Sequence, residues 1–144
     1  MSTKKRALRQ WIVVGALTAP LLAFSQATQA QGDFSGGWRS NNGEMRIEQS
    51  GSRAWGEYAM KDGRIRGDVD GDTFSGIWTQ TSSNRGCPDE RMGSRYWGRV
   101  TLHLNEEGDR FYGRWSYCDD EIGSGGGEWT GERHRDHHFG PEND

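Results

Sequence analysis

Basic side chains are few in this chain, and apart from the first ten residues they form no cluster. The 144 residues hold 18 lysines and arginines against 21 aspartates and glutamates, which gives a formal net charge of −3. Nucleic acids and anionic membrane surfaces are bound through concentrated positive charge. The composition therefore argues against nucleic acid and against a charged membrane surface as partners.

Residue types that carry catalysis are equally sparse. His103 is the only histidine before the C-terminal tail, and the alternation of its strand directs it outward. The sequence has no nucleophile elbow, phosphate-binding loop or set of four metal ligands. Asp89-Glu90 and Asp119-Asp120-Glu121 offer a carboxylate pair for acid–base chemistry, but solvated loop charges are the simpler interpretation. We predict that the protein is not an enzyme and that it has no cofactor and no metal site.

Only one long apolar stretch exists, and it lies near the N-terminus. It runs from Trp11 to Phe24, follows a basic start at residues 4–9 and precedes the small residues Ala27-Thr28-Gln29-Ala30. This order is that of a secretory signal peptide cleaved after Ala30, and the stretch is short for a membrane span. We therefore predict a signal peptide over 1–30, no membrane insertion after cleavage, and a periplasmic or extracellular chain with a net charge of −7.

Cysteine is limited to two residues, Cys87 and Cys118. In an exported protein, a pair of cysteines is typical of one disulfide. On the chain-entropy model, such a bond would stabilise the fold by roughly 3–4 kcal/mol, because it restricts the unfolded chain. A free thiol nucleophile is the alternative interpretation.

Helical periodicity is also missing, and 22 glycines would penalise any helix. Alternation of apolar and polar residues predicts eight strands instead, at 34–40, 43–49, 53–60, 64–70, 72–79, 95–104, 109–117 and 127–133. Most connections are short and polar, with Asn-Gly and Asp-Gly pairs that favour hairpins. The sequence therefore predicts an all-β fold, an eight-stranded antiparallel up-and-down β-barrel closed on itself. A two-sheet β-sandwich shows the same alternation and is the alternative.

One pattern, aromatic-x-Gly-x-Trp, occurs three times, at residues 34–38, 74–78 and 111–115. Residues i, i+2 and i+4 share a face of a strand, so each copy directs its aromatic residue, glycine and tryptophan to the interior. In an up-and-down barrel these three strands run the same way, which predicts that all three tryptophans lie at one end. The two long connections, 80–94 and 118–126, lie at this same end, which we name the mouth; the opposite end is the base.

We expect a binding site at the mouth. The predicted ligand-binding residues are the aromatic side chains that alternation directs inward there, namely Trp38, Tyr58, Trp78, Trp115 and Trp129. Aromatic rings supply contact area for a small molecule or glycan, and tryptophan adds a hydrogen-bond donor. The alternative is that these rings only fill a small barrel.

Protein partners form a rival hypothesis. The chain would then be a periplasmic or secreted interaction or inhibitor protein that acts through loops 80–94 and 118–126, with a filled barrel. Trp55 and Trp97 fall on the outward face, where exposed tryptophans can mark protein contacts and would serve a homo-oligomer. A slipped register, or packing under a neighbouring arginine, is the alternative for both tryptophans.

The first predicted strands carry a spaced motif, Gly37-Trp38, Gly43 and Gly56-Glu57-Tyr58. It resembles the opening of avidins and streptavidin, secreted eight-stranded barrels of the wider lipocalin-like (calycin) group, which reads Gly-x-Trp-x-Asn-x-x-Gly-Ser and then Gly-Thr-Tyr. The resemblance implies a barrel with a pocket at its mouth, and it implies that Tyr58 contacts the ligand. Trp129 falls where the family has a late-strand tryptophan.

The chain also departs from that family. Ser40 and Glu44 stand where the family has asparagine and serine, and nothing after Trp129 is tryptophan, although the family has one beyond its last strand. Most residues that contact biotin in the family are therefore not retained. The sequence predicts a barrel domain over 31–133 and a disordered polar tail over 134–144, whose histidines would bind metal only adventitiously.

Overall fold

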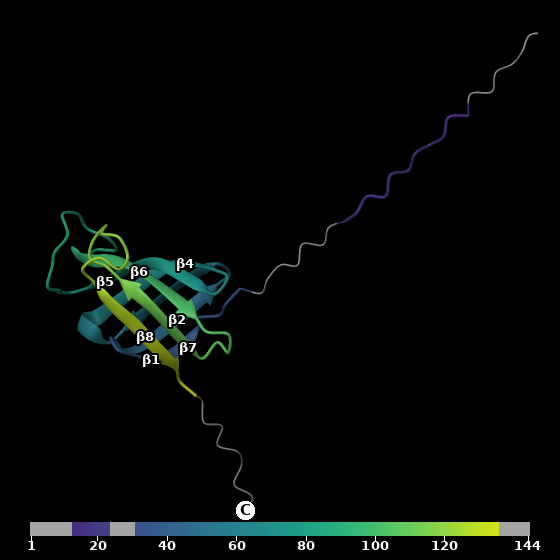
Figure 1. Cartoon of the computed structure of the whole chain (residues 1–144). Helices are drawn as coiled ribbons and strands as arrows, with labels where there is room; N and C mark the ends of the chain where they lie inside the picture. The colour runs from purple at the N-terminus through teal and green to yellow at the C-terminus, as the bar shows by residue number, and fades with distance from the viewer. Residues whose placement is uncertain (1–12, 24–30, 136–144) are drawn as a thin grey trace, which may run out of the picture.

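The computed structural model describes residues 13–23 and 31–135, and the statements below concern these residues (Figure 1). Residues 13–23 contain no helix or strand and are exposed. In the described ranges, no helix has the length and apolar character needed to cross a bilayer. The remainder of the predicted signal peptide, its cleavage site after Ala30 and most of the predicted tail lie outside the described residues.

Eight antiparallel strands form a closed barrel, in which each strand pairs with its neighbours in sequence and β8 pairs with β1 (Figure 1). The strands are β1 (Gly36–Ser40), β2 (Gly43–Ser50), β3 (Arg53–Tyr58), β4 (Gly63–Asp70), β5 (Thr73–Gln80), β6 (Tyr96–Leu104), β7 (Arg110–Trp115) and β8 (Gly127–Arg133). A short 3-10 turn, η1 (Met60–Asp62), links β3 to β4. The predicted up-and-down barrel is confirmed, and the pairing of β8 with β1 rules out the open sandwich.

The interior is filled as the alternation predicts. Its buried residues are Phe34, Trp38, Met45, Ile47, Ala54, Tyr58, Ile65, Val69, Phe74, Trp78, Val100, Leu102, Phe111 and Trp129. Gly67 and Gly76 face each other across β4 and β5. A Cβ atom on either glycine would lie 2.2 Å from a carbonyl oxygen of the other strand, so the close approach of these strands requires glycine at both positions.

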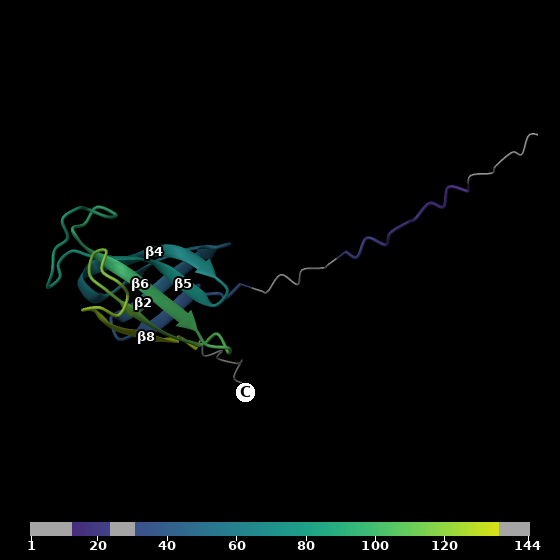
Figure 2. The same ribbon diagram turned by 45° about the horizontal axis from the view of Figure 1, so that its top comes forward.

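Both long loops leave the barrel at the mouth, and the described chain ends leave it at the base (Figures 1 and 2). The C-terminal boundary lies slightly beyond the predicted one. The amide of His134 donates to the carbonyl of Gly37 at 2.9 Å, and the His134 ring bonds to the Glu44 carboxylate. His134 therefore belongs to the barrel rather than to a disordered tail, whereas residues 136–144 lie outside the described part.

Trp38 closes the base of the barrel. Its side chain is fully buried, its indole Nε1 donates to the carbonyl of Phe34 at 2.8 Å, and its ring packs edge-on against Phe111 with 5.1 Å between centroids. Phe111 is the base residue of the third motif copy, so the first and third copies do not lie at the same height. Strands of a closed barrel are tilted and staggered, and this stagger places Trp38 at the base. The prediction that Trp38 lies at the mouth is wrong.

Arg133 covers Trp38 at the end of β8. Its guanidinium carbon lies 4.2 Å from the centroid of the Trp38 ring, a distance at which a cation is attracted to the aromatic face. The same guanidinium donates to the carbonyls of Asp33, Gly108 and Ser35, at 2.7 Å and 2.9 Å for the first two. One side chain thus ties the N-terminal segment to the β6–β7 turn and completes the base.

Candidate functional site

A cavity of about 230 Å³ lies at the mouth of the barrel. Its walls are aromatic and its rim is polar, which is the composition of small-molecule sites. The aromatic lining residues are Tyr58, Trp78, Trp115, Tyr117 and Trp129, and the polar ones include Asn42, Lys61, Gln80, Ser83 and Asn84. They come from strands β3, β5, β7 and β8 and from the turns and loops that follow β1, β3, β5 and β7.

The aromatic rings support one another through edge-to-face contacts. Tyr58 packs against Trp129 with 4.9 Å between centroids, Trp78 against Trp115 with 5.5 Å, and Trp115 against Tyr117 with 5.0 Å. Edge-to-face geometry is favourable for aromatic pairs and adds to the area they bury. The aromatic walls are therefore packed against one another in the absence of a ligand.

Two of the aromatic polar groups are already satisfied by the barrel. The Tyr58 hydroxyl donates to the carbonyl of Thr79 at 3.1 Å, and Trp78 Nε1 donates to the carbonyl of Ser116 at 3.0 Å. Burial raises the pKa of Tyr58, and a hydrogen bond with Gln80 only partly opposes this effect. Tyr58 is therefore a neutral hydrogen-bonding group at physiological pH and does not act as a base.

Trp129 differs from these two residues. Its side chain is 1% exposed, and among the described residues its Nε1 is the only buried side-chain nitrogen or oxygen without a hydrogen-bond partner. An unsatisfied buried donor costs roughly 1–3 kcal/mol, and most such groups in native proteins have a partner. Trp129 is one of the residues that line the cavity, and the Tyr58 ring packs against it.

The two long loops are fixed to each other above the mouth. Cys87 and Cys118 form the predicted disulfide, with their Cα atoms 5.6 Å apart. The amide of Cys118 donates to the carbonyl of Trp97 at 2.9 Å, and the Arg85 guanidinium pairs with the Asp120 carboxylate at 2.6 Å. The loops after β5 and β7 therefore form one unit, and the free-thiol interpretation is excluded.

Trp97 lies beneath this unit, outside the barrel wall. It pairs with Thr79 on the outward face but is fully buried against the disulfide. Its Nε1 donates to the carbonyl of Asp89 at 2.9 Å, and the Arg91 guanidinium lies 4.9 Å from its ring centroid. The prediction that Trp97 offers an exposed contact for a partner is wrong, because the 80–94 loop folds over it. Packing under an arginine was the correct alternative.

The aspartates of the acidic loop groups are paired with arginines rather than with one another. Asp89 lies 3.7 Å from Arg91, and Asp119 lies 3.9 Å from Arg99. Within the described ranges, no group of three or more potential metal ligands is close enough together to hold an ion. These carboxylates are mostly exposed, so they form solvated ion pairs of little energetic weight.

The structure brings together four of the five predicted ligand-binding residues. Trp78 and Trp129 are buried in the cavity wall, as is Tyr58, and Trp115 is half-buried at its edge. Trp38 is absent from the cavity lining because it closes the base. Tyr117 also lines the cavity and was not predicted as a site residue. The signal was present, because the inward alternation of the seventh predicted strand runs through Phe111, Gly113 and Trp115 to Tyr117.

Comparison of the chain with protein-family models, curated proteins and solved structures finds no significant match. The resemblance to avidins therefore rests on the motif residues alone and stays a prediction.

Proposed function

We propose that this protein is an exported binding protein that holds a small ligand in the mouth cavity. The observation that carries the proposal is Trp129, whose buried indole N–H lacks an acceptor while its ring lines the cavity. A ligand with a carbonyl, ether or hydroxyl oxygen would supply that acceptor. Flat or ring-shaped ligands fit best, since the walls are formed by aromatic faces and edges.

The size of the cavity limits the ligand. About 230 Å³ corresponds to about eight water molecules at ~30 Å³ each, which is below the ~300–1,000 Å³ typical of sites for drug-sized molecules. A single ring is the natural occupant, either a free small molecule or one sugar residue of a glycan. The polar rim formed by Gln80, Ser83 and Asn84 would bond to substituents that point toward solvent.

Export is part of the proposal. Its support is the order of basic, apolar and small residues over 1–30, together with the Cys87–Cys118 disulfide. Disulfides persist in oxidising compartments such as the periplasm and the extracellular space. N-terminal sequencing of the protein recovered from the culture medium or periplasm should begin at Gln31. An intact N-terminus on a protein found only inside the cell would overturn this part of the proposal.

Native mass spectrometry of protein purified from its own host tests the binding function. Wild-type protein should retain a small additional mass that is lost on denaturation. The Trp129→Phe variant removes the N–H but keeps an aromatic ring, and it should lose that mass while its circular dichroism spectrum shows that the barrel is still folded. Trp55→Phe, on the outer surface, is the matched control and should retain it. If wild-type protein and both variants carry no bound molecule, the cavity has no resident ligand and the proposal fails.

The rival function, capture of a protein partner through the two mouth loops, has one observation in its favour. The disulfide and the Arg85–Asp120 pair hold the loops as one surface, on which Met92 and Ile122 are about 40% exposed. Shortening the 118–126 loop after Asp120 would then abolish partner capture, whereas Trp129→Phe would leave it unchanged. The opposite pattern supports the cavity.

A further inference from the structure

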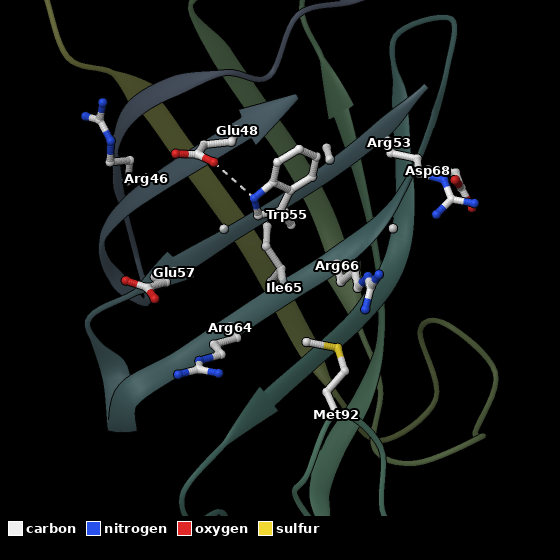
Figure 3. A pocket seen from close by; sticks show the side chains of 13 residues that line it. Arg46, Glu48, Arg53, Trp55, Glu57, Arg64, Ile65, Arg66, Asp68 and Met92 are labelled. Atoms are coloured by element: carbon white, nitrogen blue, oxygen red, sulfur yellow. Dashed lines mark hydrogen bonds between the residues drawn. The ribbon is translucent and has the colours of Figure 1, made fainter. Parts of the chain in front are cut away.

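The outer face of strands β2, β3 and β4 is hollowed and carries an exposed tryptophan (Figure 3). Trp55 projects from β3 and is 41% exposed, and its Nε1 donates to the Glu48 carboxylate at 3.1 Å. Met92, at the tip of the 80–94 loop, lines the same open hollow of about 1040 Å³ and is 40% exposed. An exposed aromatic side chain and an exposed methionine in one hollow, which charged residues also line, are the composition of a protein-binding surface.

The charges around Trp55 are arranged in rows that the strand register defines. The row nearer the mouth reads Arg46, Glu57 and Arg64 across the three strands. The row nearer the base contains Arg53 on β3 and Asp68 on β4. In the described part of the chain none of these five side chains forms a salt bridge, so their charges are free to meet a partner.

We propose that the partner is a second copy of this chain, which packs face to face about a two-fold axis running across the strands through Trp55. Such an axis brings the mouth-side row of one copy onto the base-side row of the other. Glu57 on β3 then meets Arg53 of the second copy, and Arg64 on β4 meets Asp68 of the second copy. Because a two-fold interface repeats every contact, the two pairings give four contacts between opposite charges.

The central row lies on the axis and meets its own counterpart. It contains Trp55 flanked by Glu48 and Arg66, so the two tryptophans stack at the centre of the interface. Glu48 and Arg66 each approach a like charge, which opposes association. These two contacts between like charges are outnumbered by the four contacts between opposite charges. The Glu48 carboxylate also already accepts a hydrogen bond from the Trp55 indole.

The size of the face predicts a weak dimer. Three strands spaced about 4.8 Å apart and three rows spaced about 6.8 Å apart cover about 300 Å² per copy. A stable interface of standard size buries about 800 Å² per partner. We therefore expect reversible dimers that form with rising concentration and dissociate in high salt, because salt screens exposed charge pairs.

Sedimentation velocity on the full exported chain tests the proposal, with charge reversals at the Arg64–Asp68 pairing. The variant Arg64→Asp places two acidic residues against each other, and Asp68→Arg places two arginines against each other, so each variant alone should dimerise about tenfold more weakly. An equimolar mixture of the two variants regains both pairings and should dimerise like the wild type. This rescue distinguishes an interface from a folding defect, because two misfolded variants cannot restore each other.

The matched controls are Arg114→Asp and Glu128→Arg, which are exposed cross-strand neighbours on β7 and β8. They make the same charge changes on another part of the barrel surface and should sediment as the wild type does. Wild-type protein that stays monomeric up to about 1 mM would overturn the proposal. Dimers that form normally in the single variants, or that fail to return in the mixture, would also overturn it.

Discussion

The two ends of the barrel are built from the same residue types but differ in how well their polar groups are satisfied. At the base, Trp38 donates to a backbone carbonyl, and Arg133 covers its ring while donating to three more. At the mouth, Trp129 is as deeply buried as Trp38, yet its N–H has no partner among the described residues, and a cavity lies beside its ring. A closed end with satisfied polar groups stabilises the fold, whereas the open end with an unsatisfied donor is where we propose that a ligand binds.

The base should therefore carry more of the stability than the mouth. Trp38→Ala removes a fully buried ring and the surface on which Arg133 stacks, and we expect it to lower the free energy of unfolding by about 3–5 kcal/mol. Trp115→Ala, at the half-buried edge of the cavity, should cost less than half as much. Urea denaturation followed by circular dichroism measures both values, and equal losses would remove the proposed difference between the ends.

The mouth should depend on its disulfide instead. The bond closes a loop with a sequence separation of 31 residues, and the double variant Cys87→Ala/Cys118→Ala should lose about 3–4 kcal/mol of stability on the chain-entropy model. Hydrogen exchange should accelerate most at the amides of Cys87 and Cys118 and least in β1 and β8 near Arg133. Uniform acceleration over the barrel would show that the loops and the base are not separable.

A comparison of two conservative variants isolates the unsatisfied donor. Trp78→Phe and Trp129→Phe remove similar volumes, but only Trp78 donates to a carbonyl, that of Ser116. In protein freed of any ligand, we expect Trp78→Phe to be the more destabilising by about 1–2 kcal/mol, because it leaves that carbonyl unpaired. The melting temperatures of the two variants, measured side by side, provide the test. The reverse order would mean that the Trp129 N–H is satisfied.

The smallest effect that we expect is on the stability of the fold at alkaline pH. Burial raises the pKa of Tyr58 above its ordinary value, so the folded state holds the phenolic proton more tightly than the unfolded state does. The contribution of Tyr58 to stability is therefore complete below the unfolded pKa of about 10 and declines as the pH rises above it. Tyr58→Phe should flatten that decline in denaturation curves recorded at several alkaline pH values. An unchanged slope would show that Tyr58 does not titrate differently in the two states.

Alternation within strands was sufficient to predict which side chains face the interior. The number and order of the strands and the inward direction of Tyr58, Trp78 and Trp129 followed from local pattern, and the disulfide followed from the cysteine count. The ends of the strands differ from the predicted ones by up to two residues. The position of a residue along the barrel axis could not be predicted in this way, because it depends on the stagger of the strands. That stagger is set by long-range register. For this reason Trp38 was assigned to the wrong end. Trp97 was misassigned because alternation indicates the outward direction but cannot indicate that a loop folds over it.

Whether a ligand occupies the mouth cavity can be read from the indole ¹H–¹⁵N spectrum. The spectrum of the protein as purified from its host is compared with that of the same protein after ligand removal. The Nε1–H signal of Trp129 should move, while those of Trp38 and Trp78, which are bonded to backbone carbonyls, should stay in place. Assignment follows from the Trp129→Phe spectrum. A Trp129 signal that is identical in both samples would mean that the Tyr58 ring packed against it already serves the donor and that the mouth holds no ligand.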